Sequence, residues 1–183
     1  MNRMNLLLVA AVIAVVWLQP ARAEQSPQIT IDANNIWMHV GKSPVLQYRY
    51  GDVPFKPYVK ELYTPDGLNV LLDAPADHLH HHGLMFAVAV DGLNFWEEAP
   101  TAGHQGRGSS PLTSIARHGG GPSAGFMVGI PWVDSTGAKR VLSEMRTIEV
   151  CGLDKLGATA VAWDSNLGIG KGQQSVTLSG SHY

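Results

Sequence analysis

The sequence predicts an all-β protein, built as an antiparallel β-sandwich or supersandwich. Three observations predict this class. The 20 glycines and 11 prolines are spread between short apolar segments, as turn residues are spread between strands. Several of these segments alternate apolar and polar residues, which is the pattern of a half-buried strand. Outside the N-terminal segment, no helical 3.6-residue periodicity is sustained.

The segments that carry the strand pattern are separated by turn residues. In chain order they are residues 45–50, 56–63, 68–72, 84–90, 126–133, 139–150, 159–165 and 174–183. The second and third are joined by a turn at residues 64–67, in which Pro65 suits a turn φ of about −65° and Gly67 closes the turn.

Two of these strands are expected to differ in burial. Residues 139–150 carry polar side chains on both faces, with Glu144 and Arg146 on one of them, so this strand is predicted at a sheet margin. Residues 84–90 are apolar on both faces, as in a strand buried on both sides in the middle of a sandwich. Such a strand would hold the preceding residues, 78–82, rigidly in place.

The composition fits one domain of ordinary size. A hydrophobic content of 45% is enough to fill a core, and the net charge of −2 argues against a nucleic-acid-binding protein, which would carry a basic stripe. Cys151, the single cysteine of the sequence, cannot form an intrachain disulfide. It is interpreted as a small buried side chain.

The N-terminus has the layout of a secretory signal peptide. Arg3 precedes an unbroken apolar run over residues 6–18, and Ala21 and Ala23 form a small-residue cleavage site. A membrane-spanning helix needs about 20 apolar residues, so an uncleaved anchor is the weaker alternative. We therefore expect an exported protein, secreted or periplasmic. Residues 1–23 would be removed, leaving one β-rich domain over residues 24–183 with no membrane span.

Four of the eight histidines lie within residues 78–82. If this segment is extended, His78, His80 and His82 point one way and His81 the other. Two histidines at i and i+2 can share a divalent metal ion, so His78 and His80 are candidate metal ligands. A third ligand would come from one of four other residues. The candidates are Asp77, Glu97, His104 and His182.

A second interpretation of the same histidines needs no metal. Imidazole titrates near neutral pH, so His78, His80 and His81 are candidate catalytic acids and bases, with Asp77 orienting a ring. The remaining alternative is a solvated loop whose histidines have only structural hydrogen bonds.

Side chains near the histidines are typical of a sugar-binding surface, in which an aromatic face stacks on C–H groups and polar groups hold hydroxyls. The candidate substrate-binding residues are Lys56, Tyr58, Asn94, Trp96 and Glu97. Trp96 could equally be a core residue, because large aromatic side chains are mostly buried.

Four blocks resemble, in order, motifs of the bacterial PmoA-like family, which is labelled methane oxygenase and has no established function. They are FKPYVKELYTPDGLNVL, DHLHHHGLMFA, VDGLNFW and SGSHY. Within the histidine block, Asp77, His78, His80, His81 and Leu84 match the family pattern, while Leu79 and His82 replace a proline and an arginine. The resemblance implies a chain truncated at its C-terminus, because family members continue beyond the last block.

These observations lead to one main hypothesis and two alternatives. The main hypothesis is an exported protein that processes a carbohydrate, by proton transfer or glycosidic cleavage, with a small molecule or glycan as its partner. The first alternative is a non-catalytic carbohydrate-binding or interaction module. The second is a metalloenzyme of oxygenase type, in which histidines and a carboxylate hold a divalent metal ion.

Overall fold

The computed structural model describes residues 27–53, 55–106, 111–118, 121–153, 157–170 and 172–180. Within these residues the regular structure consists of β-strands, all pairings between them are antiparallel, and no helix is present. The prediction of an all-β protein is therefore confirmed. The predicted signal peptide at residues 1–23 lies outside the described residues, as does His182. No helix in the described part of the chain is suited to crossing a membrane.

The first sheet has four strands in sequential order. They are β1 (Pro27–Ile31), β2 (Asn35–Val40), β3 (Ser43–Arg49) and β4 (Tyr58–Leu62). The β1–β2 turn is held by Asp32, whose Oδ1 accepts hydrogen bonds from the backbone N–H groups of Asn34 and Asn35 at 2.7 and 2.8 Å. The β2–β3 turn contains Gly41 at a φ of 61°, a conformation that favours glycine.

The second sheet is built around three long strands. These are β9 (Gly121–Val133), β10 (Arg140–Leu153) and β11 (Ala158–Ile169), with β10 between the other two. The shorter strands β7 (His104–Gln105) and β8 (Leu112–His118) pair with different parts of β9. A third, small sheet has the order β12-β5-β6 and consists of β12 (Leu178–Ser179), β5 (Ala89–Val90) and β6 (Leu93–Asn94).

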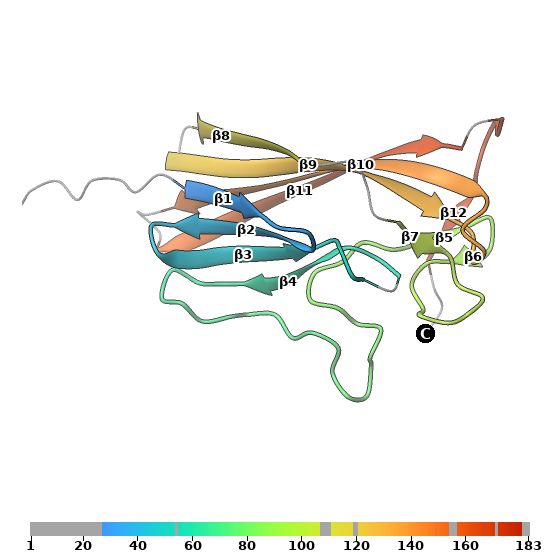
Figure 1. Ribbon diagram of the computed structural model, residues 1–183, viewed down its shortest axis with the longest axis horizontal. Coiled ribbons are helices and arrows are strands. Elements are labelled where there is room, and N and C mark those ends of the chain that lie inside the picture. The colour runs from blue at the N-terminus through green and yellow to red at the C-terminus, as the bar shows by residue number, and fades with distance from the viewer. Residues whose placement is uncertain are drawn as a thin grey trace, which may run out of the picture.

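The two large sheets form the layers of a sandwich, with the β8–β11 sheet over the β1–β4 sheet (Figure 1). The small sheet lies at one end, together with β7. The chain between β4 and β5 leaves the sandwich as a long excursion below the first sheet (Figure 1), and the histidines of residues 78–82 lie on this excursion.

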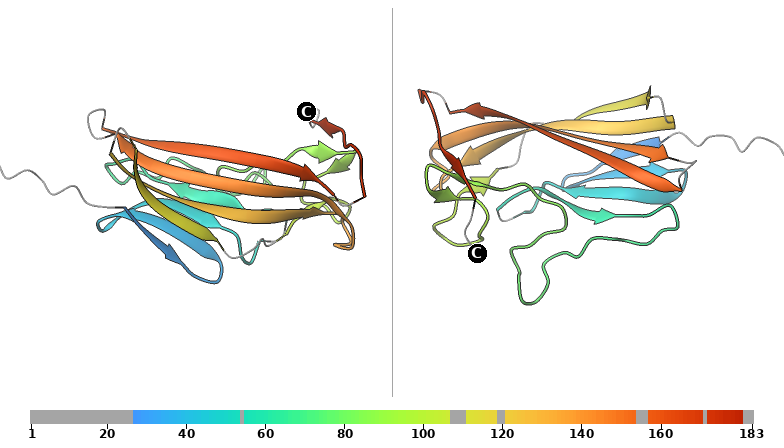
Figure 2. Two further views of the ribbon diagram at one scale, coloured as in Figure 1. Left: turned by 90° about the horizontal axis from the view of Figure 1, so that it is seen from above. Right: turned by 180° about the vertical axis from the view of Figure 1, so that it is seen from behind.

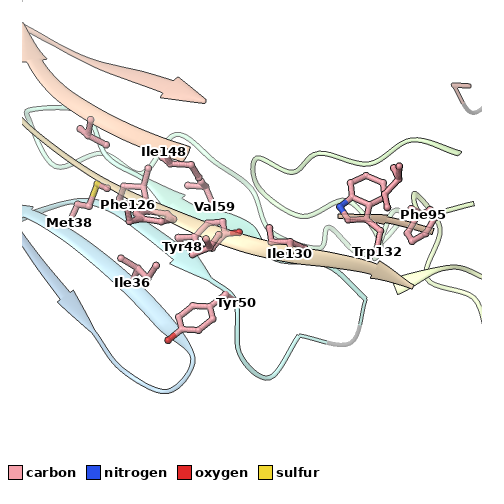
Figure 3. Close-up of a cluster of buried hydrophobic side chains, with 14 of the residues drawn as sticks. Ile36, Met38, Tyr48, Tyr50, Val59, Phe95, Phe126, Ile130, Trp132 and Ile148 are labelled. Atoms are coloured by element: carbon pink, nitrogen blue, oxygen red, sulfur yellow. The ribbon is translucent and has the colours of Figure 1, made fainter. Parts of the chain in front are cut away.

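The core lies between the two layers (Figure 3). Tyr48 of the first sheet packs on Phe126 of the second, with ring centroids 4.9 Å apart. Trp132 and Phe95 fill the end nearer the small sheet, with centroids 4.8 Å apart. The fully buried apolar residues also include Ile36, Met38, Leu46, Val59, Leu142 and Ile148.

A charged pair is buried inside this apolar core. Arg146 and Glu144 of β10 both have side chains that are 0% exposed, and Arg146 Nε lies 2.8 Å from Glu144 Oε1. All five N–H donors of the guanidinium are used. Arg146 donates through Nε and Nη2 to Glu144, through Nη1 to the Tyr48 hydroxyl and the Pro57 carbonyl, and through Nη2 to Gln105 Oε1.

Both carboxylate oxygens of Glu144 also have hydrogen-bond partners. Its carboxylate accepts hydrogen bonds from Trp132 Nε1 at 2.8 Å and from the Ser165 hydroxyl at 2.6 Å, in addition to those from Arg146. Trp163 of β11 lies under the guanidinium, with its ring centroid 4.6 Å from Arg146 Cζ. The pair therefore contacts β3, β7, β9 and β11 from its place on β10.

Two burial predictions are wrong. The strand predicted at a sheet margin is β10, which has a neighbour on each side, because its polar residues Glu144 and Arg146 are paired with each other in the core. Residues 84–90 do not form a central strand. Only β5 is regular there, and Leu84 is 38% exposed, because residues 86–88 are only partly buried against the core and no strand pairs along them.

We predict that replacing Arg146 with methionine lowers the free energy of unfolding by about 3–5 kcal/mol, because the Glu144 carboxylate is left buried without its cation. Urea denaturation measures the loss. The double variant Glu144→Met/Arg146→Met should be more stable than Arg146→Met, since no charge stays buried. Met145→Ala on the exposed face of the same strand is the control, with an expected change within about 0.5 kcal/mol. A single variant as stable as wild type would contradict this assignment.

Candidate functional site

The histidine segment is anchored to the first sheet at its C-terminal end. Leu84 and Val59 of β4 exchange two backbone hydrogen bonds of 2.9 Å. At Gly83 a Cβ atom would collide with the carbonyl oxygen of Val59, so only glycine permits this close approach. The long excursion is thus pinned to the sheet directly after the histidines.

The histidines lie on a compact turn rather than on a strand. The N–H of His81 donates to the His78 carbonyl at 2.9 Å, and the N–H of Ala74 donates to the His81 carbonyl at 2.9 Å. The predicted alternation, with His78, His80 and His82 on one face, is therefore wrong. The turn bends the segment back on itself, so ring direction no longer follows odd and even positions.

Three imidazoles gather on this turn, and we call His78, His80 and His81 the histidine cluster. The rings of His78 and His81 stack at 4.8 Å between centroids, and the His80 ring meets His81 edge-on at 4.5 Å. Trp96 adds an aromatic wall, with its ring centroid 5.6 Å from that of His81. The structure thus brings together the three histidines that the sequence predicted to be catalytic.

Two carboxylates border the histidine cluster. Glu97 Oε2 lies 3.5 Å from His80 Nδ1, and Asp77 Oδ2 lies 3.2 Å from His78 Nδ1. Asp77 is the more exposed of the two, at 79% of its side chain against 40% for Glu97. The other ring nitrogen of His80, Nε2, is buried and has no hydrogen-bond partner among the described residues.

His82 points away from this cluster and into a second, inner network. Its Nδ1 lies 2.7 Å from Asp73 Oδ1 and its Nε2 lies 3.0 Å from Glu98 Oε1. A neutral imidazole carries one N–H, so these two contacts require one further proton, on the ring or on a carboxylate. Tyr58 closes the network, because its ring stacks on His82 and its hydroxyl donates to Asp73 Oδ2 at 3.1 Å.

Lys56 supplies the positive charge at the base of the inner network. Its side chain is 0% exposed, and Nζ donates to Glu98 Oε1 and to the Trp96 carbonyl, both at 3.0 Å. Burial lowers the pKa of Lys56, and the hydrogen bond and charge of Glu98 oppose that shift. Burial also raises the pKa of Tyr58 to about 12, with the Asp73 charge adding to the effect.

The predicted substrate-binding residues therefore fall into two groups. Lys56 and Tyr58 lie inside the inner network, where they hold the loop in place. Asn94 of β6 holds the backbone of the next turn in place. Its Oδ1 accepts hydrogen bonds from the N–H groups of Trp96 and Glu97 at 2.7 and 3.2 Å. Trp96 and Glu97 are the two that border the histidine cluster.

The surroundings of His81 in the histidine cluster favour its neutral form. Desolvation lowers the pKa of His81, and the charges of His80 and His78 lower it further. Hydrogen bonds from its own backbone and from His78, together with the His78 charge, lower the pKa of Asp77. At neutral pH the site therefore contains an ionised carboxylate beside an imidazole that can accept a proton.

A metal site at His78 and His80 stays a prediction. No three histidine, cysteine or carboxylate side chains in the described ranges are arranged to hold a metal ion. Of the candidate third ligands, His104 lies on β7, where its ring packs against Phe55 at 4.7 Å between centroids.

Asp73, His82 and Glu98 form part of the inner network, and none of them is among the catalytic, metal-binding or substrate-binding residues predicted from the sequence. His82 stands where the family pattern of the resemblance has an arginine, and it lies between two carboxylates, as an arginine often does. Asp73 and Glu98 lie on either side of the histidines in sequence, at separations of 9 and 16 residues from His82. A search for carboxylates flanking the histidine block would have found them.

Comparison with known proteins places the chain in a family. A family model described as a family of unknown function (DUF6807) matches residues 35–183. No PmoA-like or methane oxygenase family matches, so the predicted resemblance was wrong. No curated protein and no solved structure matches the chain.

We predict that Glu98→Ala lowers the free energy of unfolding by about 3 kcal/mol, because Lys56 then keeps a buried charge without its carboxylate. Thermal and urea unfolding measure the change. Glu97→Ala is the matched control, since this neighbouring carboxylate is more exposed and should change stability by less than about 1 kcal/mol. Equal effects of the two substitutions would show that Glu98 does not hold the loop.

We also predict that His81 titrates below the ordinary histidine pKa, and that His80→Ala moves its pKa upward by removing a nearby positive charge. Two-dimensional NMR of the imidazole nitrogens measures both values. Because the unfolded chain binds this proton first, His81 opposes folding as the pH falls below the ordinary histidine pKa. A His81 pKa at or above the ordinary value would contradict the proposed electrostatics of the cluster.

Proposed function

The chain belongs to DUF6807, a family of unknown function, and we propose that it is an exported carbohydrate-processing protein whose histidine cluster transfers protons. The observation that carries this proposal is the environment of His80. A carboxylate of Glu97 faces Nδ1, while Nε2 has no hydrogen-bond partner in the described part of the chain. The proposal of export is independent of the site and depends on the sequence of residues 1–23.

A carboxylate at one ring nitrogen determines what the other nitrogen can do. Glu97 favours the tautomer in which Nδ1 of His80 carries the proton, so Nε2 keeps its lone pair. The same arrangement of carboxylate and imidazole orients the general base in hydrolytic enzymes. Nε2 is buried in this structure, so binding of a substrate there requires a neighbouring side chain to move. The His78 ring, whose centroid lies 6.2 Å from that of His80 and whose side chain is 49% exposed, is the candidate.

His81 is suited to the partner role in the same reaction. Its lowered pKa keeps it neutral near pH 7, and its ring contacts both His78 and His80. One imidazole then removes a proton while a neighbouring N–H donates one to the substrate. Proton abstraction beside a sugar carbonyl and protonation of a glycosidic oxygen both need such a pair. The inner network holds the turn still during this exchange.

A carbohydrate fits the groups that border the cluster. Trp96 offers a ring surface on which the C–H face of a sugar can stack, and Asp77 and Glu97 offer exposed carboxylate oxygens that accept hydrogen bonds from hydroxyls. A glycosidase that uses a pair of carboxylates is the weaker alternative, because both acids contact histidines.

We predict that the protein turns over a member of a panel of glycosides and keto-sugars, and that His80→Ala lowers kcat/KM by at least about 100-fold. Glu97→Gln should also lower kcat, because the carboxylate orients the base. NMR of the reaction in deuterated water identifies the sugar carbon that exchanges its proton. His39→Ala, on β2, is the matched control and should retain wild-type turnover.

Three results would overturn this proposal in favour of an alternative. Turnover that survives His80→Ala/His81→Ala would exclude the cluster as the acid–base group. Glycan binding without turnover would indicate a non-catalytic module. A stoichiometric metal ion in the purified protein, lost in His78→Ala/His80→Ala, would indicate the metalloenzyme alternative.

A further inference from the structure

A cleft lies away from the histidines, where β10 begins and β11 ends. Its volume is about 500 Å³, within the range of small-molecule sites. The lining residues are Ala138, Lys139, Arg140, Ser143, Ile169, Gly170 and Gln173. Figure 2 shows this part of the second sheet at the end of the sandwich that carries β12. None of the lining residues belongs to the histidine cluster or to the inner network.

A β-bulge directs Arg140 into this cleft. Arg140 pairs with Val133 and Leu142 with Trp132, so one residue of β10, Val141, has no partner on β9. Both Val141 and Leu142 are buried, at 7% and 1% exposure, whereas Arg140 is exposed. In a regular strand without this bulge, residues two apart share a face, so Arg140 would lie on the buried face of Leu142.

Gly170 allows the side chain of Gln173 to pack closely against the backbone at one wall of the cleft. A Cβ atom there would lie 2.6 Å from both Gln173 Oε1 and the Arg140 carbonyl oxygen, so a side chain would displace Gln173. Gln173 Oε1 is buried and has no hydrogen-bond partner among the described residues. An acceptor left in this state is costly, and a ligand hydroxyl would satisfy it after a small movement of the amide.

The cleft has a local excess of positive charge in a chain whose net charge is −2. Lys139 and Arg140 are both exposed, and neither forms an ion pair with a carboxylate in the described ranges. The nearby carboxylate of Asp134 is engaged by its own turn, since Oδ1 accepts hydrogen bonds from the Thr136 hydroxyl at 2.7 Å and from two backbone N–H groups.

We propose that this cleft binds a carboxylate-bearing sugar of the uronic acid class. The planar guanidinium of Arg140 matches a carboxylate with two parallel hydrogen bonds, and Lys139 adds a second positive charge. Gln173 and the Ser143 hydroxyl face the sugar hydroxyls. The Ser143 hydroxyl can still hydrogen-bond to a ligand, because its own hydrogen bond to the Gly168 carbonyl is long, at 3.4 Å. The site goes beyond the proposed acid–base function and shares no residue with it.

Titration of the full chain with glucuronate, glucose and sulfate, followed by backbone NMR, tests this site. Glucuronate should shift the signals of residues 138–143 and 168–173 saturably, and glucose should bind at least about 10-fold more weakly. Arg140→Met should weaken glucuronate binding by about 10-fold or more. Gln173→Leu should weaken binding of glucuronate but not of sulfate, because sulfate lacks the ring hydroxyls.

Lys42→Met, which removes an exposed positive charge from the β2–β3 turn, is the matched control and should leave glucuronate binding unchanged. Three results of the glucuronate titrations overturn the proposal. They are no binding of glucuronate at about 10 mM, equal affinity for glucose and glucuronate, and unchanged binding in Arg140→Met. Equal effects of Gln173→Leu on sulfate and glucuronate would likewise exclude a sugar site and leave a simple anion site.

Discussion

The buried pairing of Arg146 with Glu144 is the constraint on which the rest of the structure depends. Removing two charges from water costs several kcal/mol for each ion, and the cost is recovered only when every donor and acceptor has a partner. Here all five guanidinium donors are used, on groups from both large sheets and from the chain before β4. Sliding either sheet by one residue would break several of these hydrogen bonds together, so the pair selects one register.

The same guanidinium connects the core to the candidate site. Arg146 binds the carbonyl of Pro57, and the residues on either side of Pro57 are Lys56 and Tyr58, which hold the inner network. Gln105, another partner of Arg146, donates to the Phe86 carbonyl at 2.6 Å and so holds the chain that follows the histidines. The long excursion is thus tied to the core before the histidine turn, through Tyr58 and Asp73, and after it, through Gln105 and Phe86.

The adjacent histidines have different surroundings and therefore different properties. His82 lies between two carboxylates with its side chain 11% exposed. Both of its ring nitrogens contact these carboxylates and so help to hold the loop. His78, His80 and His81 lie outside this network, with carboxylates at the edge and neighbouring rings that desolvate His81. Position in the turn, rather than residue type, separates the structural His82 from the histidines of the proposed proton-transfer site.

The sequence by itself determined the all-β class, most of the long strands and the faces of β10, because alternation and turn chemistry act between residues that are close in the chain. It also located the histidine cluster with Trp96 and Glu97. Only the tertiary structure decided that β10 is central, that residues 84–90 are not, and that His82 belongs with Asp73 and Glu98. The burial of a charge depends on partners far away in the sequence, such as Tyr48, which is 98 residues from Arg146. No local pattern contains that information.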